Sequence, residues 1–323
     1  MVVDDDEGVD LDSGMLRAFV AVADDGHFGR AAERLVISQQ ALSKRISRLE
    51  SLLGVSLFDR SNRRVVITDT GRRLLPLARQ AVDTADAVAT EAAKNAGPLR
   101  IDVLDDYLSS MLIARGVARN GELVVEARAR TDHHDALDAL RTADADIALG
   151  RAGAVPGPWP TDIRRKVLLL EPIRLLVGSS HPFAERDAVP MAELGDVHLW
   201  FPMTGAPREW IDLVDELCED FGLVVDRTGS TLGFEYFLQR LADDPGLSTL
   251  YGGAMAPPGP ALRVLPIVEP VPVFAWWAMW RRRVPDVRVQ AVCDQAAGLD
   301  GIPLDEARDP NQVWMPAADR ARL

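Results

Sequence analysis

Hydrophobic residues recur at helical spacing in the N-terminal part of the chain, and the pattern predicts three helices in succession. The first covers about 15–23 and ends near Gly26, and the second is short, at about 28–35. The third begins after Ser38, whose hydroxyl is a good N-cap. Its apolar stripe consists of Leu42, Ile46, Leu49 and Leu53, and its polar side carries Gln40, Ser43, Lys44, Ser47 and Arg48, with Gln39 at the exposed N-terminal end.

A short helix, a tight turn and a polar-faced third helix are typical of a helix-turn-helix. Amides, hydroxyls and a cation are the groups that read base edges and phosphates, although a solvated helix in any small bundle has the same pattern. The next residues favour DNA binding. Strand-like stretches at 55–60 and 65–68 flank a turn that contains Asn62, Arg63 and Arg64. A hairpin tipped with arginines is typical of a wing that contacts the minor groove or the backbone.

Residues 69–95 predict one long helix, which Thr68 can cap and which Gly97 and Pro98 end. Pro76 lies early enough to be tolerated or to bend the first turns. One face is apolar and consists of Leu74, Leu75, Ala78, Ala81, Val82, Ala85, Val88, Ala89 and Ala92. Such a face needs a partner, either the rest of its own chain or a second subunit.

The rest of the chain alternates strand-like and helix-like stretches, at 99–104, 107–119, 123–129, 133–141 and 146–150. This βαβα order predicts a parallel sheet flanked by helices, hence an α/β fold. Trp276 and Trp280 lie on one face of a later strand-like run, where core packing is expected.

Composition and charge narrow the function. With 47% hydrophobic and 26% charged residues, the 323-residue chain suits a soluble protein of two or three domains. The net charge is −13, but residues 14–73 hold 11 Lys and Arg against 6 Asp and Glu, a net of +5, which leaves −18 for the rest. This asymmetry is expected where one domain meets phosphate and the other does not.

Several classes of protein are disfavoured. The longest strongly apolar stretch, 271–280, is far shorter than the roughly 20 residues of a membrane-spanning helix. The acidic N-terminus lacks the apolar core of a signal peptide, so a short disordered tail and a cytoplasmic location are expected. Cys218 and Cys293 lie in apolar-periodic stretches and are expected to be small buried residues. No Cys/His pattern has metal-ligand spacing, so no metal and no cofactor are predicted.

The N-terminal motifs resemble the signature of the LysR family. They are Phe-Val-Ala-Val-Ala at 19–23, Arg-Ala-Ala-Glu-Arg-Leu at 30–35, Ser-Gln-Gln-Ala-Leu-Ser at 38–43, Leu-Glu at 49–50, Leu-Gly-Val-Ser-Leu-Phe-Asp-Arg at 53–60 and Thr-Asp-Thr-Gly at 68–71, all in the family's order. Gln40 stands where many members carry Pro. The resemblance implies DNA contacts from Gln39, Gln40, Ser43, Lys44, Arg63 and Arg64. Arg30 and Arg48 are weaker candidates, since a surface arginine is more often only solvated.

The family resemblance also implies an organisation and partners. It implies a disordered N-terminus at 1–13, a winged helix-turn-helix at 14–68, a linker helix at 69–97, a two-lobed effector domain like periplasmic binding proteins at 98–300 (lobe I 98–170 and 265–300, lobe II 171–264) and a C-terminal tail at 301–323. The implied partners are double-stranded promoter DNA with an interrupted palindrome, a small-molecule effector, and further copies of the chain in a homodimer or a dimer-of-dimers tetramer. The linker helix would pair with its copy.

Ligands of such folds bind beyond the carboxyl ends of strands. Four segments meet this rule: 105–110, 130–133, 202–206 and 229–233. The candidate effector-binding residues are Ser109, Arg130, Thr131, Thr204 and Thr231, with Arg130 as a possible anion clamp, although each can equally cap a helix or face solvent. Asp105 and Asp106 disfavour a simple carboxylate ligand.

Two other classes stay open at this point. One is an enzyme or transport-type binding protein with a fused DNA-binding module, and the other is an architectural DNA-binding protein that senses nothing. No Ser-His-Asp arrangement, phosphate-binding Gly-rich loop or carboxylate pair with enzymatic spacing is present in the sequence, so no catalytic residue is predicted.

Overall fold

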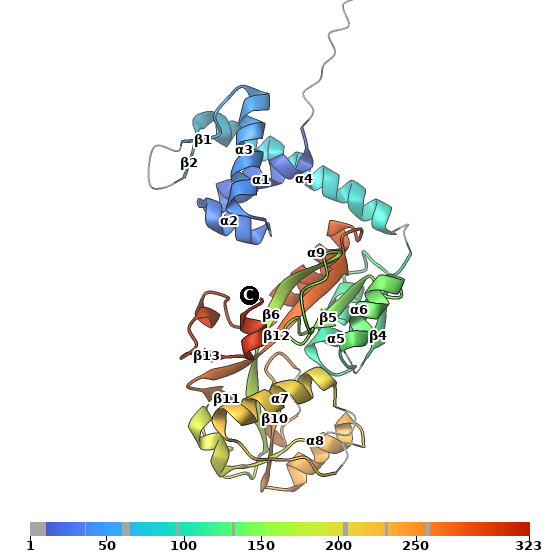
Figure 1. Ribbon diagram of the computed structural model, residues 1–323, viewed down its shortest axis with the longest axis vertical. Coiled ribbons are helices and arrows are strands. Elements are labelled where there is room, and N and C mark those ends of the chain that lie inside the picture. Colours follow the sequence, from blue (N-terminus) through green and yellow to red (C-terminus); the bar gives the residue numbers. More distant parts are fainter. Residues whose placement is uncertain are drawn as a thin grey trace, which may run out of the picture. The chain divides into compact units, whose positions relative to one another are not determined.

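The computed structural model describes residues 11–35, 37–59, 65–94, 97–130, 133–202, 206–229, 232–255 and 259–323. The chain divides into two units, residues 1–92 and 93–323. The first is mainly helical and the second is built on a long sheet (Figure 1).

The N-terminal unit contains the three predicted helices, and their presence is confirmed. Its elements are α1 (Ser13–Asp25), α2 (Phe28–Arg34), α3 (Gln39–Leu53), β1 (Phe58–Asp59), β2 (Val66–Ile67) and α4 (Asp69–Lys94). The expected disordered tail, residues 1–13, extends too far, since α1 already begins at Ser13. Asp12 accepts a hydrogen bond from the N–H of Gly14 and caps this helix. Ser38 caps α3 as predicted, and Gly54 ends it with a left-handed φ of 66°.

Buried residues of α1, α2 and α3 form the core of this unit, and the hairpin of β1 and β2 closes one side. The ring of Phe58 on β1 packs edge-to-face against Phe19 on α1, with centroids 5.6 Å apart. The carboxylate of Glu50 accepts hydrogen bonds from the N–H groups of Leu57 (2.8 Å) and Phe58 (3.3 Å). Helix α3 and the hairpin of β1 and β2 are therefore joined by two charge-assisted hydrogen bonds.

The start of α4 is also fixed to the hairpin. Thr68 accepts a hydrogen bond from the N–H of Gly71 (3.0 Å), and its own hydroxyl donates to the carbonyl oxygen of Ser56 (2.8 Å). A Cβ atom on Gly71 would lie 2.5 Å from the carbonyl oxygen of Leu57, so only glycine fits there. This close approach gives a physical reason for the Thr-Asp-Thr-Gly motif.

The C-terminal unit is organised around one strand that belongs to both of its lobes. The sheet order is β4-β3-β5-β12-β6-β10-β8-β9, with β11 paired to β6. The strands are β3 (Leu99–Val103), β4 (Val125–Ala129), β5 (Ile147–Gly150), β6 (Ile163–Gly178), β7 (Val189–Pro190), β8 (His198–Trp200), β9 (Val225–Asp226), β10 (Leu247–Gly252), β11 (Leu262–Val268) and β12 (Val271–Arg281). The first part of β6 pairs with β12 in lobe I, and its last residues pair with β10 and β11 in lobe II.

Helices cover the sheet in both lobes. Lobe I has α5 (Ser109–Arg119), α6 (His133–Thr142) and α9 (Asp286–Ala297), and lobe II has α7 (Arg208–Phe221), α8 (Phe234–Asp243) and a 3-10 helix, η1 (Met191–Asp196). The predicted parallel arrangement holds for β3, β4 and β5, whereas β12 runs antiparallel to β5. One expected boundary is wrong: β11 pairs with β6 and β7, so residues 265–268 belong to lobe II.

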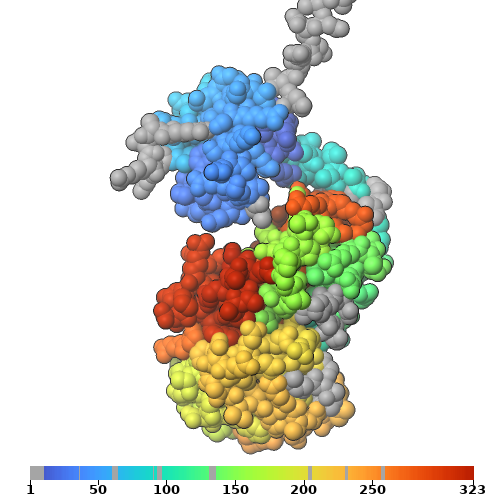
Figure 2. Space-filling view, viewed as in Figure 1, coloured from blue at the N-terminus to red at the C-terminus, as the bar shows by residue number. Residues whose placement is uncertain are grey.

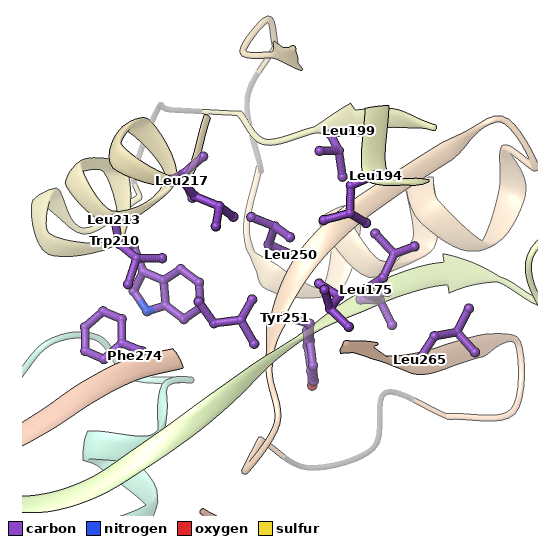
Figure 3. Packing of buried hydrophobic residues seen from close by; sticks show 14 of the residues in the cluster. Leu175, Leu194, Leu199, Trp210, Leu213, Leu217, Leu250, Tyr251, Leu265 and Phe274 are labelled. Atoms are coloured by element: carbon purple, nitrogen blue, oxygen red, sulfur yellow. The ribbon is translucent and has the colours of Figure 1, made fainter. Parts of the chain in front are cut away.

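The core of lobe II lies between the sheet and α7, and it continues into lobe I. Figure 3 shows Trp210, Leu213 and Leu217 of α7 at the left, with Leu250 and Leu175 of the sheet to their right in the same core. Trp276 of β12 belongs to this same core, as expected, whereas Trp280 packs in the core of lobe I.

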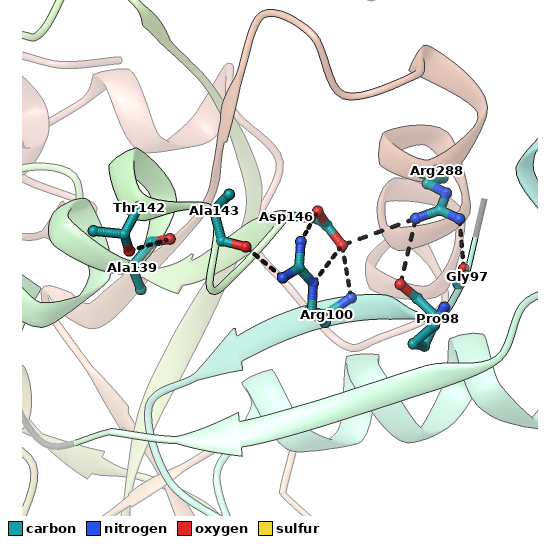
Figure 4. Close-up of polar contacts among 8 residues, drawn as sticks. All are labelled: Gly97, Pro98, Arg100, Ala139, Thr142, Ala143, Asp146 and Arg288. Carbon is teal, nitrogen blue, oxygen red and sulfur yellow. Dashed lines mark hydrogen bonds and ion pairs between the residues drawn. The ribbon is translucent and has the colours of Figure 1, made fainter.

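A cluster of polar side chains holds the first residues of the C-terminal unit against α9 (Figure 4). The guanidinium of Arg288 on α9 donates to the carbonyl oxygen of Gly97 (2.7 Å) and lies 3.8 Å from a carboxylate oxygen of Asp146. Arg100 donates to the other oxygen of Asp146 at 2.8 Å. Burial raises the pKa of Asp146, but the bonds and charge of Arg100 outweigh this and hold that pKa below its ordinary value.

The C-terminal segment is not the patternless tail that we expected. It contains η2 (Glu306–Arg308), β13 (Val313–Trp314) and α10 (Ala317–Arg320), and β13 pairs in parallel with β12. Prolines interrupt its apolar residues, so they show no period in the sequence. In the structure Ala307, Val313 and Met315 pack against β12. The indole N–H of Trp314 donates to a carboxylate oxygen of Asp220 on α7 at 2.8 Å.

The most buried of these attachments is an ion pair between Arg151, which follows β5, and Asp319. Their side chains are 1% and 0% exposed, and Arg151 Nε lies 2.7 Å from Asp319 Oδ2. Arg151 also donates to the carbonyl oxygen of Glu209 (3.1 Å) and to the carboxylate of Glu216 (3.2 Å), both on α7. The guanidinium therefore joins lobe I, lobe II and the C-terminal segment.

Asp319→Ala should destabilise the C-terminal unit by about 3–5 kcal/mol, because it leaves part of the buried guanidinium of Arg151 without its partner. Urea unfolding followed by tryptophan fluorescence measures this. Asp305→Ala, at an exposed aspartate of the same segment, is the matched control and should change stability by less than about 0.5 kcal/mol. Equal effects of the two substitutions would contradict the importance of the ion pair.

Candidate functional site

The polar face of α3 is the first candidate site. Gln39, Gln40 and Lys44 are exposed and Ser43 is half-buried. Gln40 and Lys44 lie on the side opposite the apolar stripe, and Gln39 is the first residue of the helix. Leu42, Ile46 and Leu49 are fully buried. Because these three residues fix the rotation of the helix, the polar side chains point outward together. Arg63 and Arg64 lie outside the described residues.

The second candidate site is a cavity of about 320 Å³ between the lobes of the C-terminal unit. Lobe I contributes residues 105–108, which follow β3, and lobe II contributes the ends of β8 and β10 and the first turns of α7 and α8. The cavity therefore lies beyond the carboxyl ends of strands, as the fold predicts. Six of its lining residues are aromatic: Tyr107, Phe201, Trp210, Phe234, Phe237 and Tyr251.

The aromatic rings are ordered by contacts with one another. Tyr107 of lobe I stacks on Phe234 of lobe II, with centroids 4.3 Å apart and planes 7° from parallel. Trp210, which lines the cavity, stacks on Phe274 at 5.2 Å, and Figure 3 shows these two rings next to each other. The Tyr107–Phe234 stack means that the two lobes meet through side chains that also line the cavity.

Two carboxylates lie at the lobe I side of the cavity. Asp105 is half-buried and accepts a hydrogen bond from the N–H of Asp106 at 2.6 Å, and the Asp106 side chain is exposed. Burial, together with the neighbouring Asp106, raises the pKa of Asp105 to about 6. Burial and the charge of Asp105 also raise the pKa of Tyr107. Asp105 therefore changes its charge near pH 6.

A third carboxylate, Glu171 on β6, is fully buried next to the cavity. It accepts hydrogen bonds from the Ser109 hydroxyl (2.8 Å), the N–H of Ala254 (2.9 Å) and the indole N–H of Trp276 (2.5 Å). Burial raises the pKa of Glu171 in spite of these bonds. The bonds join α5, β12 and the residues after β10 where β6 passes from one lobe to the other.

The predicted effector-binding residues have different positions. Ser109 is buried and holds Glu171, and it is not among the residues that line the cavity. Arg130 is also buried, donates to the carbonyl oxygen of Leu149 (2.7 Å), lies 3.5 Å from Glu209 Oε1 and does not line the cavity either. Thr131, Thr204 and Thr231 lie outside the described residues, so their roles stay predictions.

Three of the four predicted segments contribute to the cavity, but through neighbours of the residues that were chosen. The lining includes Pro202 and Ala206 from the third segment and Gly233 from the fourth. No aromatic residue of the lining was among the predicted effector-binding residues, although Tyr107 lies in the first predicted segment. An available signal was the pair Phe234 and Phe237 directly after Gly233, in the first turn of a helix.

Metal sites and membrane spans are both absent from the part of the chain that the structure describes. Among these residues, no group of three His, Cys, Asp or Glu side chains has a geometry that could hold a metal ion. Within the same parts of the chain, no helix is both long enough and apolar enough to cross a membrane.

Asp105→Asn should remove a pH dependence of stability. The raised pKa means that the folded state binds this proton more tightly than the unfolded state, so stability is full below about pH 4 and falls as pH rises through about 6. At pH 7 the variant should be more stable than the wild type by about 1 kcal/mol, allowing for solvent screening, and at pH 4 equally stable. Thermal unfolding at both values checks this.

Asp106→Asn, which removes the neighbouring exposed charge, is the control and should change this pH dependence less than Asp105→Asn. The assignment would be contradicted by an Asp105→Asn variant whose stability difference from wild type is the same at pH 4 and pH 7.

Comparison with known proteins gives two family matches. The model described as "Bacterial regulatory helix-turn-helix protein, lysR family" matches residues 14–72, and the one described as "LysR substrate binding domain" matches residues 92–299. The chain is similar over 90% of its length to the solved structure of a full-length OxyR variant from Pseudomonas aeruginosa, of which it covers 96%, with a TM-score of 0.51 and 24% identity. This likeness concerns the fold.

Two curated relatives are similar over a shorter range. The uncharacterized HTH-type transcriptional regulator YnfL of Escherichia coli (strain K12) is 34% identical over 192 residues, which are 55% of this chain and 61% of that protein. The probable hydrogen peroxide-inducible genes activator of Mycobacterium leprae (strain TN) is 34% identical over 193 residues, which are 57% of this chain and 60% of that protein. The chain thus matches about three fifths of the length of these two relatives.

Proposed function

This chain belongs to the LysR family of bacterial helix-turn-helix regulators, and on that basis we propose that it regulates transcription by binding promoter DNA under the control of a small effector. The observation that carries the proposal is the combination of an outward polar face on α3 with a cavity in a separate two-lobed unit. The role is binding and not catalysis, and the location is cytoplasmic, where the DNA is.

In this proposal α3 enters the major groove. Gln39, Gln40 and Ser43 contact base edges, and Lys44 contacts phosphate. Arg63 and Arg64 of the wing contact the minor groove or the backbone. The target is an interrupted palindrome, because two copies of α3 in a symmetric dimer would read two half-sites.

Lys44→Ala should weaken binding to all DNA sequences alike and reduce the slope of log affinity against log salt by about 1, since one phosphate contact is lost. The matched control is Arg45→Ala. Arg45 lies on the same helix but on another side, with its guanidinium beside Gly14 of α1, and should change the slope less. Fluorescence anisotropy at several salt concentrations measures both. An unchanged Lys44→Ala slope would remove this residue from the phosphate contacts.

Gln39→Ala should instead relax sequence preference. A good bidentate base contact contributes about 1–3 kcal/mol of discrimination, so selection from randomised DNA should show reduced preference at particular base pairs. Unchanged preference at every position would exclude a base contact by this residue.

The second part of the proposal concerns assembly through α4. Leu74, Leu75 and Ala78 of α4 pack against the N-terminal core, whereas Leu77 and Val88 are 61% and 67% exposed. Leu77, Ala81 and Val88 follow one another at spacings of four and seven and so share one face of the helix. This exposed face would pair with its copy in a homodimer, and a dimer of dimers would use further contacts.

Val88→Glu should weaken dimerisation by placing charge in an apolar seam, without disturbing the core of the subunit. Ala87→Glu adds the same charge to an exposed position about 100° away on the helix and is the control. Sedimentation of the full chain decides between them. A Val88→Glu protein that self-associates as tightly as wild type would refute pairing through this face.

Peroxide sensing through a thiol is not part of the proposal, although one relative is named as a peroxide-inducible activator. Burial raises the pKa of both Cys218 and Cys293. A raised pKa disfavours the thiolate, which is the form that reacts with oxidants. The cavity between the lobes is therefore the better candidate for the sensor.

A further inference from the structure

We propose that the cavity between the lobes binds a small organic cation, a protonated or quaternary amine with an aromatic face. This inference rests on the proposed function only in treating the cavity as the effector site. It concerns the chemical class of the ligand, which the geometry of the cavity restricts.

The charged residues in the lining of the cavity are all acidic among those that the structure describes. Among the described residues that line the cavity, Asp105 and Asp106 are acidic and none is Lys, Arg or His. The buried cations near this region, Arg130 and Arg151, face Glu209, Glu216 and Asp319. A carboxylate ligand would meet two carboxylates without a counter-charge in the lining, which is unfavourable.

The rest of the lining is suited to a cation with apolar surface. Tyr107, Phe234 and Trp210 are among its six aromatic residues, and the faces of such rings attract ammonium groups. Tyr107 is close to Asp105 in the chain and stacks on Phe234 of the other lobe. A ligand between Asp105 and these rings would therefore combine an ion pair with ring contacts from both lobes.

The size of the cavity limits the ligand. A volume of about 320 Å³ is at the small end of the range for ligand sites, which suits a molecule with one aromatic ring. Phenethylamine, which is protonated at neutral pH, is a suitable probe. 2-Phenylethanol has the same shape without the charge, and phenylacetate carries the opposite charge.

Because Asp105 can be protonated, binding of a cation should depend on pH, which binding to a purely apolar site would not. Asp105 in the free protein has a pKa of about 6, and a bound ammonium would hold it ionised. Binding of the cation should therefore release protons near pH 6 and weaken by about tenfold from pH 7 to pH 5, since one proton then competes with the ligand.

The experiment is isothermal titration of the full chain with the three probes at pH 7 and pH 5. We expect phenethylammonium to bind at least about tenfold more tightly than 2-phenylethanol at pH 7, because a cation–ring contact and an ion pair are added. Phenylacetate should bind more weakly than 2-phenylethanol. Asp105→Asn should abolish most of the tenfold preference and its pH dependence while leaving the binding of 2-phenylethanol unchanged.

Asp187→Asn, at an exposed aspartate that does not line the cavity, removes the same charge and is the matched control. The inference is overturned if phenylacetate binds more tightly than phenethylammonium, if charge makes no difference, or if no probe binds at millimolar concentration. These outcomes leave DNA binding untouched, and a failure to bind DNA would leave the probe preference untouched, so the two proposals fail separately.

Discussion

The C-terminal unit depends on the contacts that the buried guanidinium of Arg151 makes with three parts of the chain. The guanidinium lies at the end of β5 in lobe I, contacts Glu209 and Glu216 on α7 of lobe II, and pairs with Asp319 of the C-terminal segment. A buried charge must keep all of its partners, because each lost contact leaves it uncompensated. The relative position of β5, α7 and the last residues is therefore strongly specified.

The same contacts shape the cavity. Glu209 is adjacent to Trp210, which lines the cavity, and Pro207 lies one turn earlier in the same wall. Glu171 accepts hydrogen bonds from Ser109, Ala254 and Trp276 and lies beside Gly252 of the lining. Two buried carboxylates thus fix the walls, while Asp105 and Asp106 are left with their charges facing the cavity region. A site of this kind is set up for electrostatic recognition by a rigid frame.

The N-terminal unit depends instead on an apolar stripe of α3, which can be recognised in the sequence. The rotation of α3 follows from the burial of Leu42, Ile46 and Leu49, and this stripe is visible as a spacing of four and three residues. The caps at Ser38 and Gly54 and the exposed polar face could therefore be predicted from local residues alone. The candidate DNA-binding residues that the structure describes are all at the surface or partly exposed.

The ligand site could be predicted only in outline. The loops after the strands predicted where the site lies, because ligands of this fold bind beyond the carboxyl ends of strands and this depends only on topology. Its lining depends on contacts such as Tyr107 with Phe234, which join residues far apart in the chain and have no local period. Ser109 belongs to a predicted segment that contributes to the cavity, whereas the segment of Arg130 does not. The side chains of both are bonded to carboxylates far away in the chain, those of Glu171 and Glu209. The role of Asp319 was missed for the same reason.

In the proposed function, this chain reads specific DNA through paired copies of α3. Sequencing of the genomic DNA fragments that the purified full chain protects from nuclease tests it most directly. The account predicts that the protected fragments share an interrupted palindrome, with half-sites separated by about one or two turns of the double helix, on one face of the DNA. Protection without any common sequence would contradict it.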